Sequence, residues 1–114
     1  MIRVRNAYEP PLREDGFRVL VDRLWPRGLK KEKAAVDLWL RDVAPSAELR
    51  RWFGHDHARW NEFRRRYRRE LRDKPQLLTF LRSRGRRGTV TLVFGARDRE
   101  FNNAVALRNQ LVSH

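Results

Sequence analysis

The sequence predicts an α/β fold, in which a small parallel, or mostly parallel, sheet of about three strands is flanked by helices in a Rossmann-like three-layer arrangement. Residues 17–23 contain a Val-Leu-Val run, and residues 89–94 are β-branched and almost wholly apolar, as is typical of strands covered on both faces of a parallel sheet. The residues between and after these runs show helical spacing. With 114 residues, the chain has room for one domain, which we expect to span 1–114.

Three segments are candidate strands. Residues 2–5 alternate between apolar and basic side chains, although the segment is short. Residues 17–23 contain a Val-Leu-Val run that ends at a Trp-Pro-Arg-Gly turn. Residues 89–94 are almost wholly apolar and are followed by a turn over residues 95–98. Two of the three strands are therefore predicted to be buried in a sheet that is covered on both faces.

Capping residues define the helices in the middle of the chain. Ser46 is a good N-cap for a helix that ends at Gly54. Asp56 can cap the next helix, which is predicted to run to about residue 72. One face of that helix is an apolar stripe and is expected to be buried. The stripe consists of Trp60, Phe63, Tyr67 and Leu71.

Three further segments are predicted to be helical. Residues 30–43 have apolar side chains at helical spacing but no clear cap, which indicates a helix or a few helical turns. Pro75 starts a helix for which Gly85 is the expected stop. Asp98 is the expected cap of the last helix of the chain.

Basic residues dominate the charge of the chain. Lys and Arg number 27 against 14 Asp and Glu, which gives a net charge of +13 and a pI near 11.6. Of these cations 23 are Arg, a skew that a GC-rich coding sequence can also produce, so the charge is weaker evidence for nucleic-acid binding than its size suggests. The charge is also localised, since residues 59–87 hold 12 cations and three anions, a net of +9.

The composition excludes several classes of site. The chain has no Cys, which rules out disulfides, thiolate nucleophiles, zinc fingers and iron–sulfur clusters. No apolar run approaches the ~18 residues that a membrane span needs. No signal peptide is recognised at the N-terminus. We therefore expect a cytoplasmic protein with no membrane partner, and the sequence leaves its oligomeric state open.

Several motifs carry a resemblance to a known family. They are RVLVDRLWPRG at 18–28, DLWL at 37–40, APS at 44–46, LRRWFGHD at 49–56 and TLVFGARD at 91–98. Together they resemble the YeaO-like branch of a bacterial family classed as a domain of unknown function, which implies a cytoplasmic α/β fold and supplies no established activity. Two positions depart from the family's usual pattern: Gly95 stands where an aromatic is frequent, and Asn103 where His is common. If that His carries chemistry in the family, this chain lacks the imidazole at that position.

The carboxyl ends of the two strong strands predict a site for a small anionic ligand, which is the leading hypothesis. In open parallel sheets, ligands bind outside these ends. Guanidinium groups next to a helix N-terminus at residues 98–101 would bind phosphate or carboxylate, and an indole ring there could stack on a base or ring. The alternative is that Asp-Arg pairs hold the loops together and the Trp belongs to the core. The candidate residues are Asp22, Arg23, Trp25, Arg27, Arg97, Asp98 and Asn102.

No catalytic residue can be assigned from the sequence, which leaves open whether the protein is an enzyme. Asp22 and Asp98 could act as an acid/base pair only if their surroundings separate their pKa values, and no pattern indicates this. Ser46 is better explained as a helix cap than as a nucleophile. His55 and His57 lack a distant partner that would complete a metal site, so we expect no metal. No G-x-G-x-x-G motif or P-loop is present, and no cofactor is expected.

The basic segment 59–87 predicts an alternative function, nucleic-acid binding. A solvent-facing arginine surface attracts phosphate backbones with salt-dependent and sequence-tolerant affinity. The aromatic residues of this segment belong to the stripe predicted to be buried, so no stacking platform is expected. Two other interpretations are a solvated helix face and a surface that docks an acidic protein. The candidate residues are Arg64, Arg65, Arg68, Arg69, Arg72, Arg84, Arg86 and Arg87.

Overall fold

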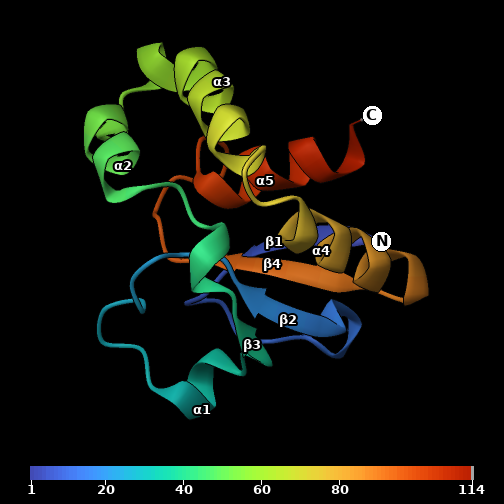
Figure 1. Cartoon of the computed structure of the whole chain (residues 1–114). Coiled ribbons are helices and arrows are strands. Elements are labelled where there is room, and N and C mark those ends of the chain that lie inside the picture. Colours follow the sequence, from blue (N-terminus) through green and yellow to red (C-terminus); the bar gives the residue numbers. More distant parts are fainter. Residues whose placement is uncertain (114) are drawn as a thin grey trace.

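The computed structural model describes residues 1–113, and a four-stranded, all-parallel sheet lies at its centre (Figure 1). His114, the last residue of the expected domain, lies outside the described residues. The strand order is β1-β4-β2-β3, which confirms the predicted α/β fold and adds one strand to the expected three. The strands are β1 (Ile2–Asn6), β2 (Phe17–Leu20), β3 (Leu38–Trp39) and β4 (Val90–Phe94).

The strand register brings the carboxyl ends of the strands to one edge of the sheet. Asn6 at the end of β1 pairs with Phe94 at the end of β4. Leu20 at the end of β2 pairs with Val93 of β4 and with Trp39 of β3. The loops that follow β1, β2 and β4 therefore leave the sheet side by side, and this edge is where a site can be built from distant parts of the sequence.

The longer helices all contribute to the core on one face of the sheet, and the opposite face is covered by a short helix and its flanking loops (Figure 1). The helices on the first face are α2 (Ala47–Phe53), α3 (Trp60–Leu71), α4 (Pro75–Arg87) and α5 (Asn103–Val112). The short helix is α1 (Lys31–Ala34), and three 3₁₀ turns are η1 (Arg13–Asp15), η2 (Arg41–Val43) and η3 (His57–Arg59). Within residues 1–113, no helix is both long and apolar enough to cross a membrane.

Two hydrophobic clusters pack against the two faces of the sheet. Alternate residues of a strand point to opposite faces, so Leu92 of β4 belongs to the larger cluster and Val93 to the smaller one. The larger cluster includes Phe63 of α3 and Leu107 of α5, both almost fully buried. The smaller cluster includes the partly buried ring of Trp39. The sheet is therefore buried on both faces, as the continuous apolar runs predict.

The predicted caps of α2 are confirmed, and the predicted cap of α3 is corrected. The Oγ of Ser46 accepts a hydrogen bond from the N–H of Leu49, and Gly54 ends α2 with a φ of +52°. Asp56 caps the short turn η3, not α3 itself, by accepting from the N–H of Ala58. The predicted stripe of α3 is buried as expected, at Trp60, Phe63, Tyr67 and Leu71.

Residues 30–43 differ from the predicted helix. Only α1 and η2 are helical, and Leu38 and Trp39 form the edge strand β3 between them. The indole N–H of Trp39 donates to the carbonyl oxygen of Asp22 at 2.7 Å, and the N–H of Leu40 donates to that of Leu20. Pairing with β2 therefore overrides the helical spacing of the apolar residues, which periodicity alone cannot reveal.

The predicted ends of the last two helices are also corrected. Gly85 does not stop α4, which continues to Arg87. Gly85 is buried because β1 packs closely against it, and a Cβ at this position would lie 2.9 Å from Cγ1 of Ile2. Asp98 does not cap α5, which begins at Asn103 and is capped by Asn102, whose Oδ1 accepts from the N–H of Val105.

A buried ion pair holds η1 against the sheet. Asp15 is fully buried and Arg18 of β2 is 3 % exposed, and Nη1 of Arg18 lies 2.5 Å from Oδ2 of Asp15. The remaining guanidinium nitrogens of Arg18 donate to the carbonyl oxygens of Ala34 and Ala35 at the end of α1. One side chain therefore fixes η1, β2 and α1 relative to one another.

Candidate functional site

Asp22 joins the loops after β2 and β4 to the start of α5 at the carboxyl edge of the sheet. It follows β2, and its Oδ2 accepts from the N–H of Gly95, which follows β4, at 2.8 Å. Its Oδ1 accepts from the side-chain amide of Asn103 at 3.0 Å. Burial raises the pKa of Asp22, and these two hydrogen bonds and the charge of Arg50 oppose that rise.

The small residue after β4 makes this arrangement possible. A Cβ at Gly95 would lie 3.2 Å from Oδ2 of Asp22 and 3.4 Å from Cβ of Pro26. The carboxylate therefore approaches the backbone where a larger residue would push it away. Gly95 and Asn103, the two departures from the family pattern, both donate a hydrogen bond to the carboxylate of Asp22.

The guanidinium of Arg23 binds the loop that precedes α2. Its Nε donates to the carbonyl oxygen of Pro45 at 3.2 Å, and one terminal nitrogen donates to that of Ala44 at 3.4 Å. These acceptors are neutral, so the positive charge of Arg23 is not cancelled by a carboxylate there. The guanidinium holds the β2 loop to the α2 loop and still contributes charge to the edge of the sheet.

Trp25 and Arg27 have different surroundings. The indole of Trp25 donates to the carbonyl oxygen of Leu29 at 2.6 Å and packs edge-on against Trp39, with ring centroids 5.5 Å apart. This side chain is therefore part of the smaller hydrophobic cluster as well as of the site edge. The side chain of Arg27 is exposed, and its carbonyl oxygen accepts from the hydroxyl of Tyr8 at 2.7 Å.

Arg97 and Asp98, in the loop after β4, are not hydrogen-bonded to Asp22 in the described part of the chain. Arg97 is exposed. Asp98 accepts hydrogen bonds from the backbone N–H groups of Phe101 and Glu100, which lower its pKa. A hydrogen bond with Nε2 of His57 lowers the pKa of Asp98 further. The expected helix N-terminus at residues 98–101 is instead a turn that Asp98 organises.

A cavity of about 310 Å³ lies at this edge of the sheet, and we call it the carboxyl-edge cavity. Five of the seven predicted residues line it: Asp22, Arg23, Trp25, Arg27 and Asn102. Arg97 and Asp98 are not among its lining residues. Other residues also line the cavity that the sequence did not indicate as ligand contacts, and they include Tyr8, Phe53, Phe63, Phe101, Arg50, His55 and Asn103.

Long-range packing brings the unexpected residues to the cavity. Arg50 lies on α2 and Phe63 on α3, and no motif connects either of them with β2 or β4. Asn103 carried a weak signal, as a departure from the family pattern next to a predicted candidate. Within residues 1–113, no group of three or more His, Asp or Glu side chains is arranged to hold a metal ion. Ser46 donates to Glu70 at 2.6 Å while it caps α2, so its hydroxyl is engaged on both sides.

The predicted basic surface is divided into separate parts. Arg64, Arg65 and Arg68 line a groove between α3 and α5, whereas Arg69 lines a depression between α2 and α3. Arg84 lies over the ring of Phe17 at 3.7 Å from its centroid. The remaining candidates, Arg72, Arg86 and Arg87, are exposed at the ends of α3 and α4.

Comparison with known proteins identifies relatives but no activity. The chain is 42% identical over 110 residues to the uncharacterized protein Rv3073c of Mycobacterium tuberculosis, covering 96% of this chain and 92% of that protein. It is 37% identical over 112 residues to the uncharacterized protein YeaO of Escherichia coli, covering 98% of this chain and 97% of that protein. No solved structure matches the chain.

The family assignment rests on the full length of the chain. A family model described as the inactive DUF488-N3 subclade matches residues 1–114. The YeaO similarity extends over nearly the same residues, so the motifs, the fold and both comparisons agree. The chain belongs to this YeaO-like family of unknown function, in the subclade described as inactive.

Proposed function

We propose that the carboxyl-edge cavity binds a small organic molecule that carries a phosphate or carboxylate group. The cavity has the size and mixed lining of a small-molecule site, with aromatic rings beside a few polar groups. Phe53, Phe63 and Phe101 supply apolar surface for the body of the ligand. Arg27 and Arg50 supply the charge for its anionic group.

The balance of charge in the cavity carries this proposal. Arg23, Arg27 and Arg50 line it against one carboxylate, Asp22. Both oxygens of Asp22 already accept hydrogen bonds, and within residues 1–113 the guanidinium groups of Arg27 and Arg50 make no hydrogen bond or ion pair. Two exposed cations at the mouth of a partly apolar cavity favour an anion with an apolar or aromatic body.

The same geometry favours binding without turnover. Asp22 is the partly buried acidic residue that lines the cavity, and the Gly95 N–H and the Asn103 amide hold it in place. An amide at position 103 cannot exchange protons as an imidazole can. The description of the subclade as inactive agrees with this arrangement. The protein would then act as a receptor for its ligand rather than as a catalyst.

A pair of adjacent arginines provides the test. Thermal unfolding and isothermal titration would be measured with panels of nucleoside monophosphates, sugar phosphates and aromatic carboxylates. Arg50→Gln is expected to weaken binding of a hit about tenfold or more, because a charge-assisted hydrogen bond contributes about 1.5–3 kcal/mol. Arg51→Gln is the matched control, since Arg51 is exposed on the same helix but does not line the cavity. The proposal fails if no anion stabilises the protein or if both variants lose affinity equally.

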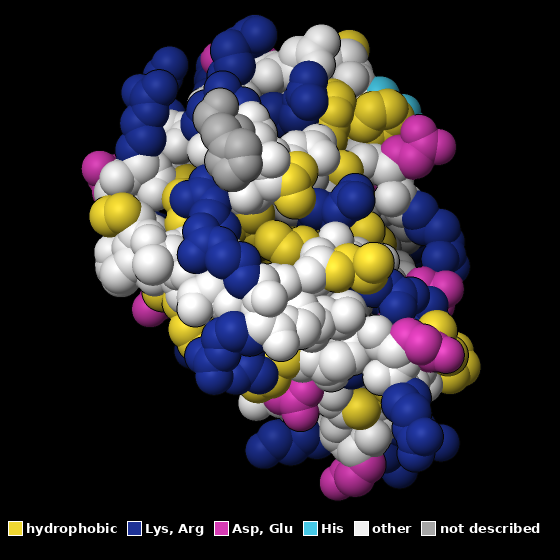
Figure 2. Space-filling model, turned by 90° about the vertical axis from the view of Figure 1, so that its right-hand side faces the viewer, with side chains coloured by type: hydrophobic (Ala, Val, Ile, Leu, Met, Phe, Trp, Pro, Cys, Tyr) yellow, Lys and Arg dark blue, Asp and Glu magenta, His cyan; other side chains and the backbone are white. Residues whose placement is uncertain are grey.

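A second candidate function, nucleic-acid binding by the basic surface of residues 59–87, has one specific observation in its favour. Part of this surface is hollowed into a groove lined by arginine and amide side chains. Figure 2 shows Lys and Arg side chains spread over one face of the molecule, with Asp and Glu fewer and mostly near its margin. Binding of a labelled oligonucleotide that weakens steeply with salt would support this function, and absence of binding at low salt would exclude it.

A further inference from the structure

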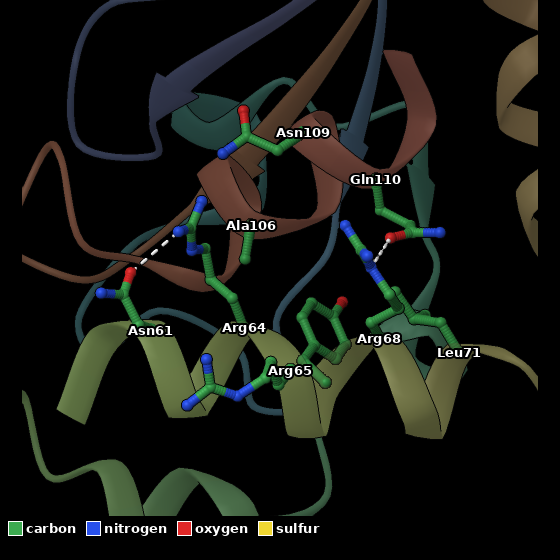
Figure 3. A pocket seen from close by; sticks show the side chains of 9 residues that line it. Asn61, Arg64, Arg65, Arg68, Leu71, Ala106, Asn109 and Gln110 are labelled. Carbon is green, nitrogen blue, oxygen red and sulfur yellow. Dashed lines mark hydrogen bonds between the residues drawn. The ribbon is translucent and has the colours of Figure 1, made fainter. Parts of the chain in front are cut away.

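The groove between α3 and α5, which we call the α3–α5 groove, has a volume of about 380 Å³ (Figure 3). Residues of both helices line it, and Figure 3 shows Arg64 and Arg68 of α3 extending toward α5. Its lining consists of Asn61, Arg64, Arg65, Tyr67, Arg68, Leu71, Ala106, Asn109 and Gln110. No carboxylate is among these residues, so the groove is a concave surface of positive charge.

Neutral partners orient two of the arginines. A terminal nitrogen of Arg64 donates to Oδ1 of Asn61 at 2.8 Å, and Nε of Arg68 donates to Oε1 of Gln110 at 2.8 Å (Figure 3). An amide oxygen fixes the direction of a guanidinium without cancelling its charge. Each guanidinium carries five N–H donors, so most of them remain available to an anion.

Two neighbouring arginines of α3, Arg65 and Arg66, share one carboxylate instead. Glu62 accepts from Arg65 at 2.9 Å and from Arg66 at 3.0 Å, and these hydrogen bonds hold its pKa below the usual range. Arg66 also lies over the ring of Trp52, 4.1 Å from its centroid, on the side of α3 that faces α2. Arg64 and Arg68 therefore differ from Arg65 and Arg66 in that their side-chain partners are neutral amides, and both line the α3–α5 groove.

The spacing of the two cations suits a linear polyanion. Arg64 and Arg68 are four residues apart on α3, which separates them by about 6 Å along the helix axis. Asn109 lines the opposite wall and can donate from its amide. The ring of Tyr67 is 1 % exposed and its hydroxyl donates to the carbonyl oxygen of Val43, so no aromatic ring is offered for base stacking. Contacts in the groove would therefore be with phosphates.

We propose that the α3–α5 groove binds the phosphodiester backbone of single-stranded nucleic acid, with Arg64 and Arg68 as its phosphate-binding residues. This inference rests on the second candidate function and names its site and ligand form. A groove between two helices takes one strand, whereas duplex readers present a protruding helix or ribbon to the nucleic acid. Binding through phosphates makes the interaction sequence-tolerant and strongly salt-dependent.

Two double variants on one helix test the proposal. Fluorescence anisotropy with a labelled mixed-sequence DNA single strand would be measured across a salt series. Arg64→Gln with Arg68→Gln is expected to weaken binding tenfold or more at low salt. The same change should reduce the magnitude of the slope of log K against log salt by about 1.4, since each phosphate contact on a single strand contributes about 0.7.

Arg66→Gln with Arg69→Gln is the matched control. It removes the same charge from the same helix, but both side chains line the depression between α2 and α3. All four positions are exposed, and thermal unfolding of each variant checks that the fold is intact. The expected result is that the control retains most of the affinity and the salt slope of the wild-type chain.

The possible failures are distinguishable. Absence of wild-type binding to any nucleic acid removes the second candidate function and this site with it. Equal losses in the two double variants leave nucleic-acid binding in place but overturn the α3–α5 groove as the site. Tighter binding of a duplex of the same sequence overturns the single-strand assignment, and a loss of affinity with an unchanged salt slope overturns the phosphate role of Arg64 and Arg68.

Discussion

Replacing Arg18 with Met is expected to destabilise the fold, because the substitution leaves a buried carboxylate without its hydrogen-bonded cation. Asp15 is fully buried, and its Oδ2 lies 2.5 Å from Nη1 of Arg18. Methionine retains a flexible stem of similar length but removes every donor. The carbonyl oxygens of Ala34 and Ala35, which Arg18 binds at 2.9 and 3.1 Å, lose their partner as well.

The size of the effect follows from the burial and from the neighbouring cations. Removing one partner of a buried ion pair costs about 3–5 kcal/mol. Arg5 and Arg3 approach the carboxylate to 3.7 and 3.9 Å, too far for hydrogen bonds but close enough to offset part of its charge. We therefore expect a loss of about 3 kcal/mol, the lower end of the range for a buried pair that loses one partner. Such a loss is a large part of the ~5–15 kcal/mol that stabilises a typical domain.

Urea unfolding at neutral pH, followed by circular dichroism, measures this loss. Adding Asp15→Asn to Arg18→Met is expected to restore part of the stability, because the buried charge disappears while an amide oxygen can still accept from the N–H of Leu12. Arg13→Met is the control at an exposed position and should change the stability by no more than about 0.5 kcal/mol. A loss below about 1 kcal/mol for Arg18→Met, or no recovery in the double variant, would refute the reasoning.

Two further predictions concern packing and pH. Gly85→Ala is expected to lower the free energy of unfolding by about 1 kcal/mol. Overpacking against Ile2 costs about 1–3 kcal/mol, and the higher helix propensity of Ala offsets about 1 kcal/mol of that cost. An unchanged or higher unfolding midpoint in urea would contradict the close approach at 2.9 Å. The pKa of Asp98 is lowered in the folded state, so its contribution to stability should be present above about pH 4 and lost as the pH falls through the folded-state pKa. Urea unfolding of the wild-type chain and of Asp98→Asn over a pH series would show this as a stability difference that shrinks in acid, and a difference independent of pH would count against it.

The parts of the fold that could be predicted are those set by local pattern. The apolar run of β4 and the Ser46 cap of α2 identify themselves within a few residues of sequence. Trp39 does not, because its place in β3 depends on a hydrogen bond to Asp22 and on pairing with a strand about 20 residues earlier. The helix end predicted at Gly85 is wrong because this glycine is required by close contact with β1, which lies far away in the sequence.

The candidate site was predictable to the extent that topology alone places it. The parallel sheet brings Asp22 and Asn102 to one edge, as the rule for open sheets indicates. The rule does not predict the surroundings of Asp98, because a turn of four residues separates Asp98 from α5. Its carboxylate is hydrogen-bonded to His57 and does not line the cavity. Arg50 shows the reverse case, in which a helix outside the sheet motifs supplies a lining residue that no local pattern indicates.

The role of each arginine in this chain is decided by the atom that it binds, which composition does not reveal. Arg18 binds a buried carboxylate, and Arg82 binds the carbonyl oxygens of Gln110 and Leu111 at the end of α5, so both hold the fold together. Arg66 shares the carboxylate of Glu62 with Arg65 at the surface, so part of its charge is compensated. Arg64 and Arg68 are oriented by amides and keep their charge. Because a preorganised and uncompensated cation is what an anionic partner requires, the +13 of the whole chain overstates the surface that can bind one, and variants should be chosen by partner atom rather than by position in the basic segment.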